Sequence, residues 1–220
     1  MLIDGVPITP AVYVRDLGIY LDHDLSMRTH VQRTVSRCFA ALRQLRQIRH
    51  SVPAATFQTL VVALVHSRLD YGNSVLVGIP VYLMRRLQSV LNVAARLIFH
   101  LRRCDRISDA LVCLHWLRVP ERIEFKIAVL TYKVLCGAAP RYQGPLNRTA
   151  DMADRRPLRS SSATNRLVVP SYRLSSVGSR AFPVAAAKIW NALPDNLVFA
   201  TSLQSFWRHL KTFFFQRSFS

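Results

Sequence analysis

SMRTHVQRTVSRCFAALRQLRQIRH, residues 26–50, is the first of three helices that we expect between Ser26 and Leu101. Its apolar residues recur at steps of three and four, which places them on one face of a helix. They are Val31, Val35, Cys38, Leu42 and Leu45. From Met27 to His50 the segment contains no acidic residue. We therefore expect an apolar face turned inward and a basic surface elsewhere.

Two further helices follow, each opened by a proline, a residue that fits the first turn of a helix. The one after Pro53 is apolar nearly all round from Phe57 to Val65, which predicts a place in the middle of a bundle. The one after Pro80 carries apolar residues in heptad-like register, at Leu83, Leu87, Val90, Ala94, Leu97 and Leu101. Three such helices can close a bundle through short connections.

The flanking segments predict a mainly α protein. Residues 1–25 carry two extended candidates, Leu2–Ile8 and Leu17–Leu21, and form a short N-terminal β segment. Residues 26–104 form the three-helix bundle. Residues 105–220 form a C-terminal helical region with a basic, Pro- and Ser-rich loop at 138–180. Short strands are expected in that loop at 166–169 and 172–174. The helices of this region are expected after Ser108, over 120–137, over 182–192 and after Thr201, where Thr201 and Gln204 match a capping box.

The net charge is +18, and all but four of the 30 basic residues are arginine. Such a charge attracts polyanions, nucleic acid first and an anionic membrane surface second. Arginine also binds phosphate through two hydrogen bonds from its planar guanidinium group, which lysine lacks. The alternative is a GC-rich coding sequence that favours arginine codons.

Eight arginines of the bundle are the candidate nucleic-acid contacts, because charges along an exposed helix face match a sugar-phosphate backbone. They are Arg28, Arg33, Arg37, Arg43, Arg46, Arg85, Arg86 and Arg96. The alternative, a merely solvated face, would normally include acids for balance.

The sequence offers no complete metal or catalytic set. Asp22-His23-Asp24 suits a divalent cation, but a polar turn with Ser26 as N-cap explains the same residues. The spacing of Cys104, Cys113 and His115 fits no structural zinc site. We expect no metal, and free thiols.

The chain is also expected to be intracellular, in the nucleus or the cytoplasm, rather than secreted. It lacks the basic start and apolar core of a signal peptide. Its apolar runs are shorter than a bilayer requires, so we expect no membrane span. Nucleic acid, and not a membrane, is the expected partner.

A series of short motifs resembles the region after the catalytic palm in non-LTR, LINE-type (jockey-like) retrotransposon reverse transcriptases. The series covers nearly the whole chain in the family's order. Its members include Leu17-Gly18-Ile19-Tyr20-Leu21-Asp22, Ser67-Arg68-Leu69-Asp70-Tyr71, Leu114-His115-Trp116-Leu117, Leu158-Arg159-Ser160-Ser161, Gly178-Ser179-Arg180-Ala181-Phe182 and Trp190-Asn191-Ala192-Leu193-Pro194.

This resemblance implies that Leu17, Gly18 and Ile19 correspond to a primer grip, residues 26–104 to the thumb, and the remainder to the C-terminal region of an RNA-directed DNA polymerase. The family's Tyr/Phe-x-Asp-Asp motif, which holds Mg²⁺ in the parent enzyme, is absent. Arg118 stands where relatives usually have proline, and Tyr142-Gln143 replaces a common Tyr-Leu.

The resemblance therefore predicts a truncated, non-catalytic portion of the polymerase that needs no cofactor of its own. It would hold RNA or an RNA–DNA hybrid, with the missing palm and fingers as possible partners. A protein-interaction module and a non-functional translated relic are the alternatives.

Overall fold

A computed structural model describes residues 2–3, 6–7, 11–151 and 165–219. The described chain is mainly helical with short antiparallel strands near its N-terminus, which confirms the predicted fold class. It divides into two compact units, described here separately. Unit 1 comprises residues 1–72 and 79–105, and unit 2 comprises residues 73–78 and 106–220.

Unit 1 begins with two short hairpins. β1 (Leu2–Ile3) pairs with β2 (Val6–Pro7), and β3 (Tyr13–Asp16) pairs with β4 (Ile19–Asp22), both antiparallel. The sequence did not predict β3, whose four side chains are all exposed and so lack an apolar alternation. The predicted strand at Leu17–Leu21 instead begins with the hairpin turn. Leu17 and Gly18 there have φ of 44° and 83°.

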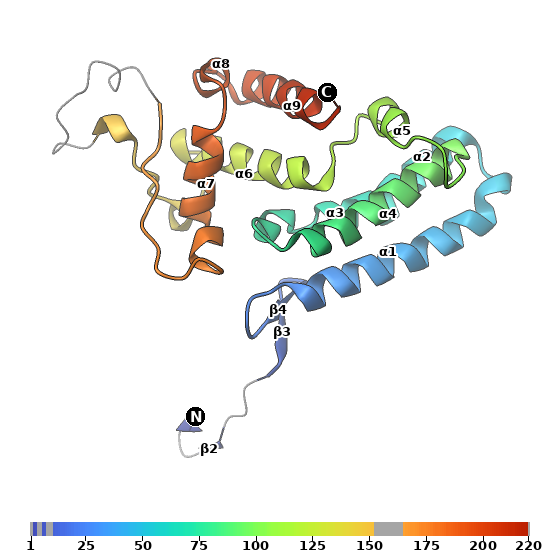
Figure 1. The fold of residues 1–220 in the computed structure, drawn as a ribbon, viewed down its shortest axis with the longest axis horizontal. Coiled ribbons are helices and arrows are strands. Elements are labelled where there is room, and N and C mark those ends of the chain that lie inside the picture. The colour runs from blue at the N-terminus through green and yellow to red at the C-terminus, as the bar shows by residue number, and fades with distance from the viewer. Residues whose placement is uncertain (1, 4–5, 8–10, 152–164, 220) are drawn as a thin grey trace. The chain divides into compact units, whose positions relative to one another are not determined.

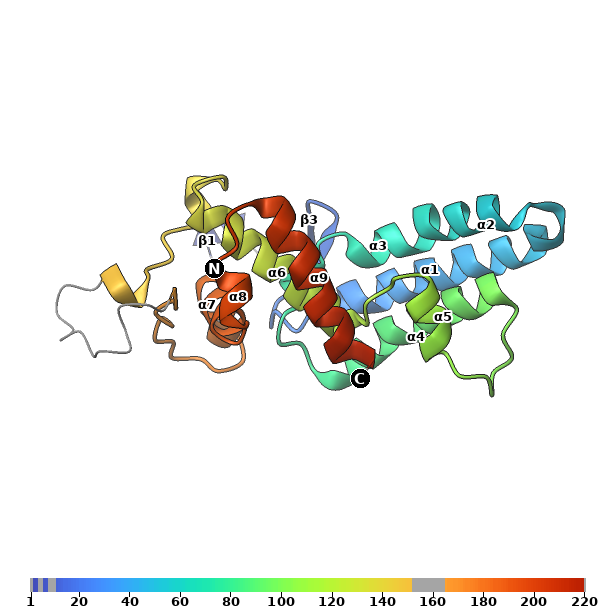
Figure 2. The same ribbon diagram turned by 90° about the horizontal axis from the view of Figure 1, so that it is seen from above.

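Three helical segments run alongside one another in unit 1 (Figures 1 and 2). α1 (Arg28–Ile48) is followed by the 3₁₀ turn η1 (Arg49–Ser51). The second segment joins α2 (Ala54–Val61), the π-helical turn η2 (Val62–His66) and α3 (Ser67–Asp70). α4 (Val81–Phe99) is the third.

The buried side chains of α1 and α4 recur at the expected spacing. Those of α1 include Val31, Val35, Cys38, Leu42 and Leu45, and those of α4 include Leu83, Leu87, Val90 and Ala94. Leu97 and Leu101, predicted to belong to the same face, are only half-buried.

The second segment is buried on one side only, so its predicted central position was wrong. Phe57, Val61, Val65 and Leu69 are buried, whereas Val62 and Leu64 are 36 % and 39 % exposed. Small and aliphatic side chains on the outer side explain why the sequence looked apolar all round.

The turn before α1 is held by Asp22 rather than by the predicted Ser26 cap. The Asp22 carboxylate accepts hydrogen bonds from the Thr29 backbone N–H (3.2 Å) and from the Ser26 hydroxyl (3.1 Å). Burial would raise the pKa of the Asp22 carboxyl, but hydrogen bonds from Thr29, Ser26 and the backbone of Arg28 outweigh it and leave this pKa lowered. Asp24 accepts from the Ser26 backbone N–H at 2.9 Å. Both carboxylates of the Asp-His-Asp triplet therefore act as turn and cap acceptors.

The described residues of unit 2 form the 3₁₀ turn η3 (Asn73–Leu76), four longer helices, the short helix α8 and three further 3₁₀ turns. The longer helices are α5 (Ser108–Cys113), α6 (Val119–Leu135), α7 (Phe182–Asn191) and α9 (Leu203–Phe219). α8 (Asp195–Val198), which the sequence did not predict, lies between α7 and α9. The 3₁₀ turns are η4 (Arg141–Gln143), η5 (Thr149–Asp151) and η6 (Gly178–Arg180).

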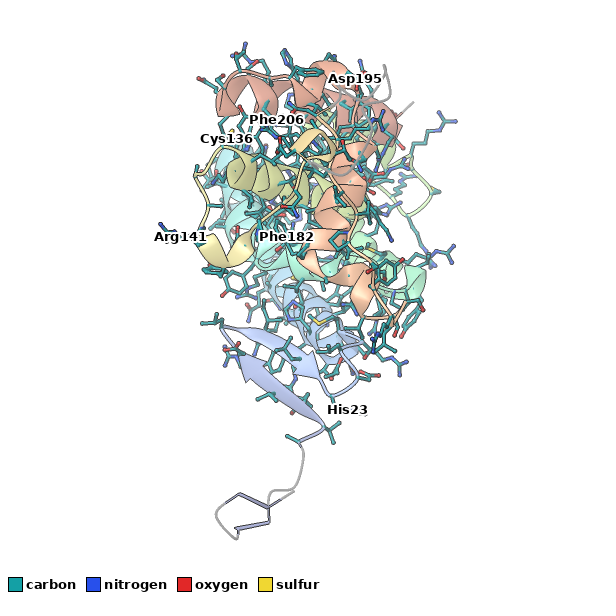
Figure 3. The ribbon with its side chains drawn as sticks, turned by 90° about the vertical axis from the view of Figure 1, so that its left-hand side faces the viewer. His23, Cys136, Arg141, Phe182, Asp195 and Phe206 are labelled. Carbon is teal, nitrogen blue, oxygen red and sulfur yellow. The ribbon has the colours of Figure 1, made fainter. Side chains whose placement is uncertain are left out.

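Aromatic packing holds α6, α7 and α9 together. Phe206, which Figure 3 labels, is fully buried on α9. It stacks on Tyr132 of α6 with ring centroids 4.5 Å apart. Its ring also lies 5.7 Å from that of Trp190 on α7. The buried face of α9 includes Phe206, Leu210 and Phe214, whereas Leu203 and Trp207 are exposed.

The two strands expected at 166–169 and 172–174 do not form. Arg148 and Leu167 make an isolated antiparallel bridge. The backbone N–H and carbonyl of Leu167 form hydrogen bonds with the side chain of Asn191 instead of with a neighbouring strand. Its amide accepts from the Leu167 N–H and donates to the Leu167 carbonyl, both at 2.8 Å. At α9, Ser202 rather than Thr201 caps the helix, since its hydroxyl accepts from the Ser205 N–H. The Ser160–Ser162 run, with Arg155, Arg156 and Arg159, lies outside the described residues.

Candidate nucleic-acid interface

A groove between α1 and α4 collects basic side chains of unit 1. Its volume is about 560 Å³. Its lining residues are Phe39, Leu42, Arg43, Arg46, Arg49, Val93, Arg96, Leu97, His100, Leu101 and Arg103. We call it the arginine groove. It combines an apolar floor with five guanidinium groups, a composition suited to a polyanion that also has flat or apolar parts.

A second hollow extends the arginine groove toward the start of α4. It is lined by Val35, Ser36, Phe39, Arg43, Arg86 and Ser89. Because Phe39 and Arg43 line both, the two form one basic channel along α1. From Ser36 to Arg49 a helix rises about 20 Å, at 1.5 Å per residue.

The end of the channel is fixed by Arg49. Its guanidinium donates to the Ile98 carbonyl at 2.8 Å and lies 5.5 Å from the centre of the Phe57 ring. The neighbouring His50 and His100 rings are 6.5 Å apart. Burial, and then the charges of Arg49 and His50, lower the pKa of His100, as expected in a strongly positive field.

Acidic residues are almost absent from this part of the chain. Between Met27 and Arg103 the sequence contains one, Asp70. Its carboxylate lies 3.4 Å from the Nδ1 atom of His66 on the second helical segment and does not line the arginine groove. The positive charge of the groove is therefore not balanced by carboxylates on its own walls.

The structure brings together four of the eight predicted contact residues. Arg43, Arg46 and Arg96 line the arginine groove, and Arg86 lines its extension. Arg28 and Arg85 are exposed and line neither stretch. The spacing of charges along one helix could not predict that Arg86 lines the extension and Arg85 does not. That outcome depends on which side of α4 packs against α1.

Arg33 and Arg37, the other two predicted contacts, hold the β3–β4 hairpin against α1. Arg33 donates to the Tyr13 hydroxyl (2.7 Å), and Arg37 donates to the Tyr20 hydroxyl (3.1 Å). The Arg33 guanidinium also lies 4.7 Å from the centre of the Tyr20 ring. Burial would raise the pKa of the Tyr20 hydroxyl, but the charges of Arg37, Arg15 and Arg33 outweigh it and leave this pKa lowered.

The three residues compared with a primer grip form the hairpin turn and its exit. The Tyr71 hydroxyl donates to the carbonyl of Leu17. A Cβ atom on Gly18 would lie 3.2 Å from the Tyr71 ring, and one on Gly72 would lie 2.7 Å from Ile19. Gly18 and Gly72, both with positive φ, thus let the turn and the end of α3 pack closely.

Sequence reasoning missed Arg49, His100 and Arg103 in the arginine groove. Arg49 and Arg103 lie beyond the helix ends, where periodicity carries no information. His100 is itself the left-handed residue that ends α4 (φ 55°), and the sequence did not predict this conformation.

In the part of the chain that the structure describes, neither a metal site nor a membrane span is seen. Within the described ranges, no group of three or more His, Cys, Asp or Glu side chains is arranged to hold a metal ion. Every helix there is either too short or too polar to traverse a lipid bilayer.

The chain matches no protein-family model, no curated protein sequence and no solved structure.

Proposed function

We propose that this chain binds nucleic acid, with the sugar-phosphate backbone of one strand lying in the arginine groove. The observation that carries the proposal is the convergence of Arg43, Arg46, Arg96 and Arg103 on one channel without a lining carboxylate. Phosphate contacts of this kind fix a strand without selecting its sequence.

The shape of the channel supports a strand rather than a compact anion. A length of about 20 Å corresponds to roughly six phosphates of one strand, at 3.4 Å each along a duplex axis. The apolar floor, which includes Phe39 and Leu97, would contact sugars or bases while the arginines contact phosphates.

We further propose that the strand belongs to RNA or to an RNA–DNA hybrid, and that the unit serves as a thumb-like clamp similar to that of non-LTR retrotransposon reverse transcriptases. The ordered motif series supports this part of the proposal. On this view the chain supplies binding, and the carboxylates that hold Mg²⁺ in such polymerases belong to another part of the enzyme.

Binding of a labelled RNA–DNA hybrid, followed by fluorescence anisotropy, tests the proposal. Heparin serves as a competitor that offers charge without bases. We expect Arg43→Gln combined with Arg96→Gln to weaken hybrid binding strongly, and Arg85→Gln to leave it nearly unchanged. Equal losses in both proteins, or no preference for the hybrid over heparin, would contradict the proposal. Saturable capture of a protein at high salt would favour an interaction module instead.

A further inference from the structure

A second basic hollow lies on the other flank of the buried stripe of α1. Its volume is about 400 Å³, within the range of roughly 300–1,000 Å³ typical of small-ligand pockets. It is lined by Gly18, His30, Thr34, Arg37, Arg68 and Tyr71. We propose that this hollow, the phosphate pocket, binds a single phosphate group.

The phosphate pocket is separate from the arginine groove. With 3.6 residues per turn, His30, Thr34 and Arg37 fall on one stripe of α1. Phe39, Arg43 and Arg46 fall on another stripe, beyond the buried residues Val31, Val35 and Cys38. The pocket therefore has its own donors, and its proposal does not rest on strand binding in the groove.

Two guanidinium groups supply the positive charge of the pocket. Arg68 donates to the Arg37 carbonyl at 3.4 Å, and Arg37 donates to the Tyr20 hydroxyl at 3.1 Å. Each guanidinium has five N–H donors, so a single hydrogen bond leaves most of them for a ligand. Contacts that anchor the side chains in this way also reduce the entropy lost when a ligand binds.

His30 adds a neutral donor. Its ring is buried, with 6 % of the residue exposed, and its Nδ1 atom accepts from the Tyr20 backbone N–H at 3.5 Å. Because Nδ1 is an acceptor, the neutral ring carries its proton on Nε2, which becomes the donor available to the pocket. Burial and the charge of Arg37 lower the pKa of His30, against an opposing effect of Asp22, and favour this neutral form.

No carboxylate lines the pocket. Asp22 is occupied by Ser26 and Thr29, and Asp70 lies against His66. The lining thus offers donors from Arg37, Arg68, His30 and the Thr34 hydroxyl. Phosphate, with several acceptor oxygens and up to two negative charges, matches this set better than a carboxylate does.

The same chemistry can come from two sources, free inorganic phosphate or the terminal phosphate of a nucleic-acid strand. Calorimetric titration of inorganic phosphate into the full chain, against chloride at equal ionic strength, tests the pocket directly. We expect saturable binding that Arg68→Gln weakens about tenfold, since a hydrogen bond to a charged group is lost. Arg85→Gln, an exposed change of the same charge, is expected to have no effect.

A short oligonucleotide with and without a 5′-phosphate separates the two sources. Tighter binding of the phosphorylated strand, abolished by Arg68→Gln, identifies a strand end. Saturable binding of inorganic phosphate without such a difference identifies the free anion. Either result supports the pocket.

Phosphate heats equal to those of chloride would overturn the proposal, as would equal effects of Arg68→Gln and Arg85→Gln. If Arg68→Gln does not fold, phosphate binding by Thr34→Val serves as the test, because this change removes one lining hydroxyl at nearly constant side-chain volume. Unchanged phosphate affinity in that variant would overturn the pocket. Arg46→Gln should alter only the arginine groove, so failure of one proposal can be told from failure of the other.

Discussion

Replacing Arg46 by glutamine should change the salt dependence of nucleic-acid binding by a calculable amount. Of the five arginines that line the arginine groove, Arg49 is partly buried, donates to the Ile98 carbonyl and lies over the Phe57 ring, so we count the other four as phosphate contacts. Arg86 in the extension makes a fifth available cation. A duplex contacted by all of them should show a slope of about −4.5 in log K against log salt, from about 0.9 per phosphate.

Losing Arg46 should reduce the magnitude of that slope to about 3.6. Between about 50 and 200 mM salt the unmodified chain would then lose roughly 500-fold in affinity and the variant roughly 150-fold. Arg43→Gln together with Arg46→Gln should lose only about 40-fold over the same range.

Fluorescence anisotropy at several salt concentrations measures these slopes. Arg85→Gln is the matched control, because it removes the same charge from the same bundle without touching the arginine groove. The reasoning is refuted if Arg46→Gln leaves the slope unchanged, or if Arg85→Gln reduces it by as much. Either result would mean that the whole surface, and not the channel, attracts the strand.

Three further predictions concern the interior. Phe206→Ala should cost about 3–5 kcal/mol of unfolding free energy, measured by urea denaturation with tryptophan fluorescence, because a fully buried stacked ring is lost; a cost below about 1 kcal/mol would contradict this packing. A thiol reagent should label the three exposed cysteines in the folded protein and Cys38 only after unfolding, since burial raises its pKa to about 11. NMR titration should place the pKa of His30 below its ordinary value of 6.5. Because the unfolded chain then binds the proton first, His30 should contribute its full stabilisation above pH 6.5, and this should be lost as the pH falls through the folded pKa.

Local patterns predicted the helices of this chain well. The apolar spacing of α1, Pro53 and Pro80 before the next helical segments, and Gly137 after α6 are signals within a few residues of one another. Gly137 has a φ of 67°, and the Ala138 N–H donates to the Lys133 carbonyl at 2.8 Å, so the helix ends as expected.

The candidate interface was harder to predict because it depends on which helices become neighbours. Arg33 and Arg43 look alike in the sequence, yet one stacks on Tyr20 and the other lines the arginine groove. The tyrosines that engage Arg33 lie on the hairpin, and β3 carried no recognisable pattern. The strand predicted at 166–169 was wrong for a similar reason. Asn191, which lies far along the sequence on α7, forms hydrogen bonds with the backbone of Leu167.

The π-helical turn at Val62–His66 keeps one face of the second helical segment buried along its whole length. Its buried residues Phe57, Val61, Val65 and Leu69 repeat every four positions. In a regular α-helix each such step advances about 40° too far, so the stripe would turn away by about 120° over three steps. The wider turn absorbs that drift. Deleting one residue there should give a regular helix with the same face buried, because eleven steps of about 100° bring Leu69 within about 20° of the direction of Phe57. Inserting one residue should instead rotate Leu69 by about 100° and carry Tyr71 away from the hairpin turn. This segment should therefore tolerate the loss of one residue at the π-helical turn far better than the gain of one.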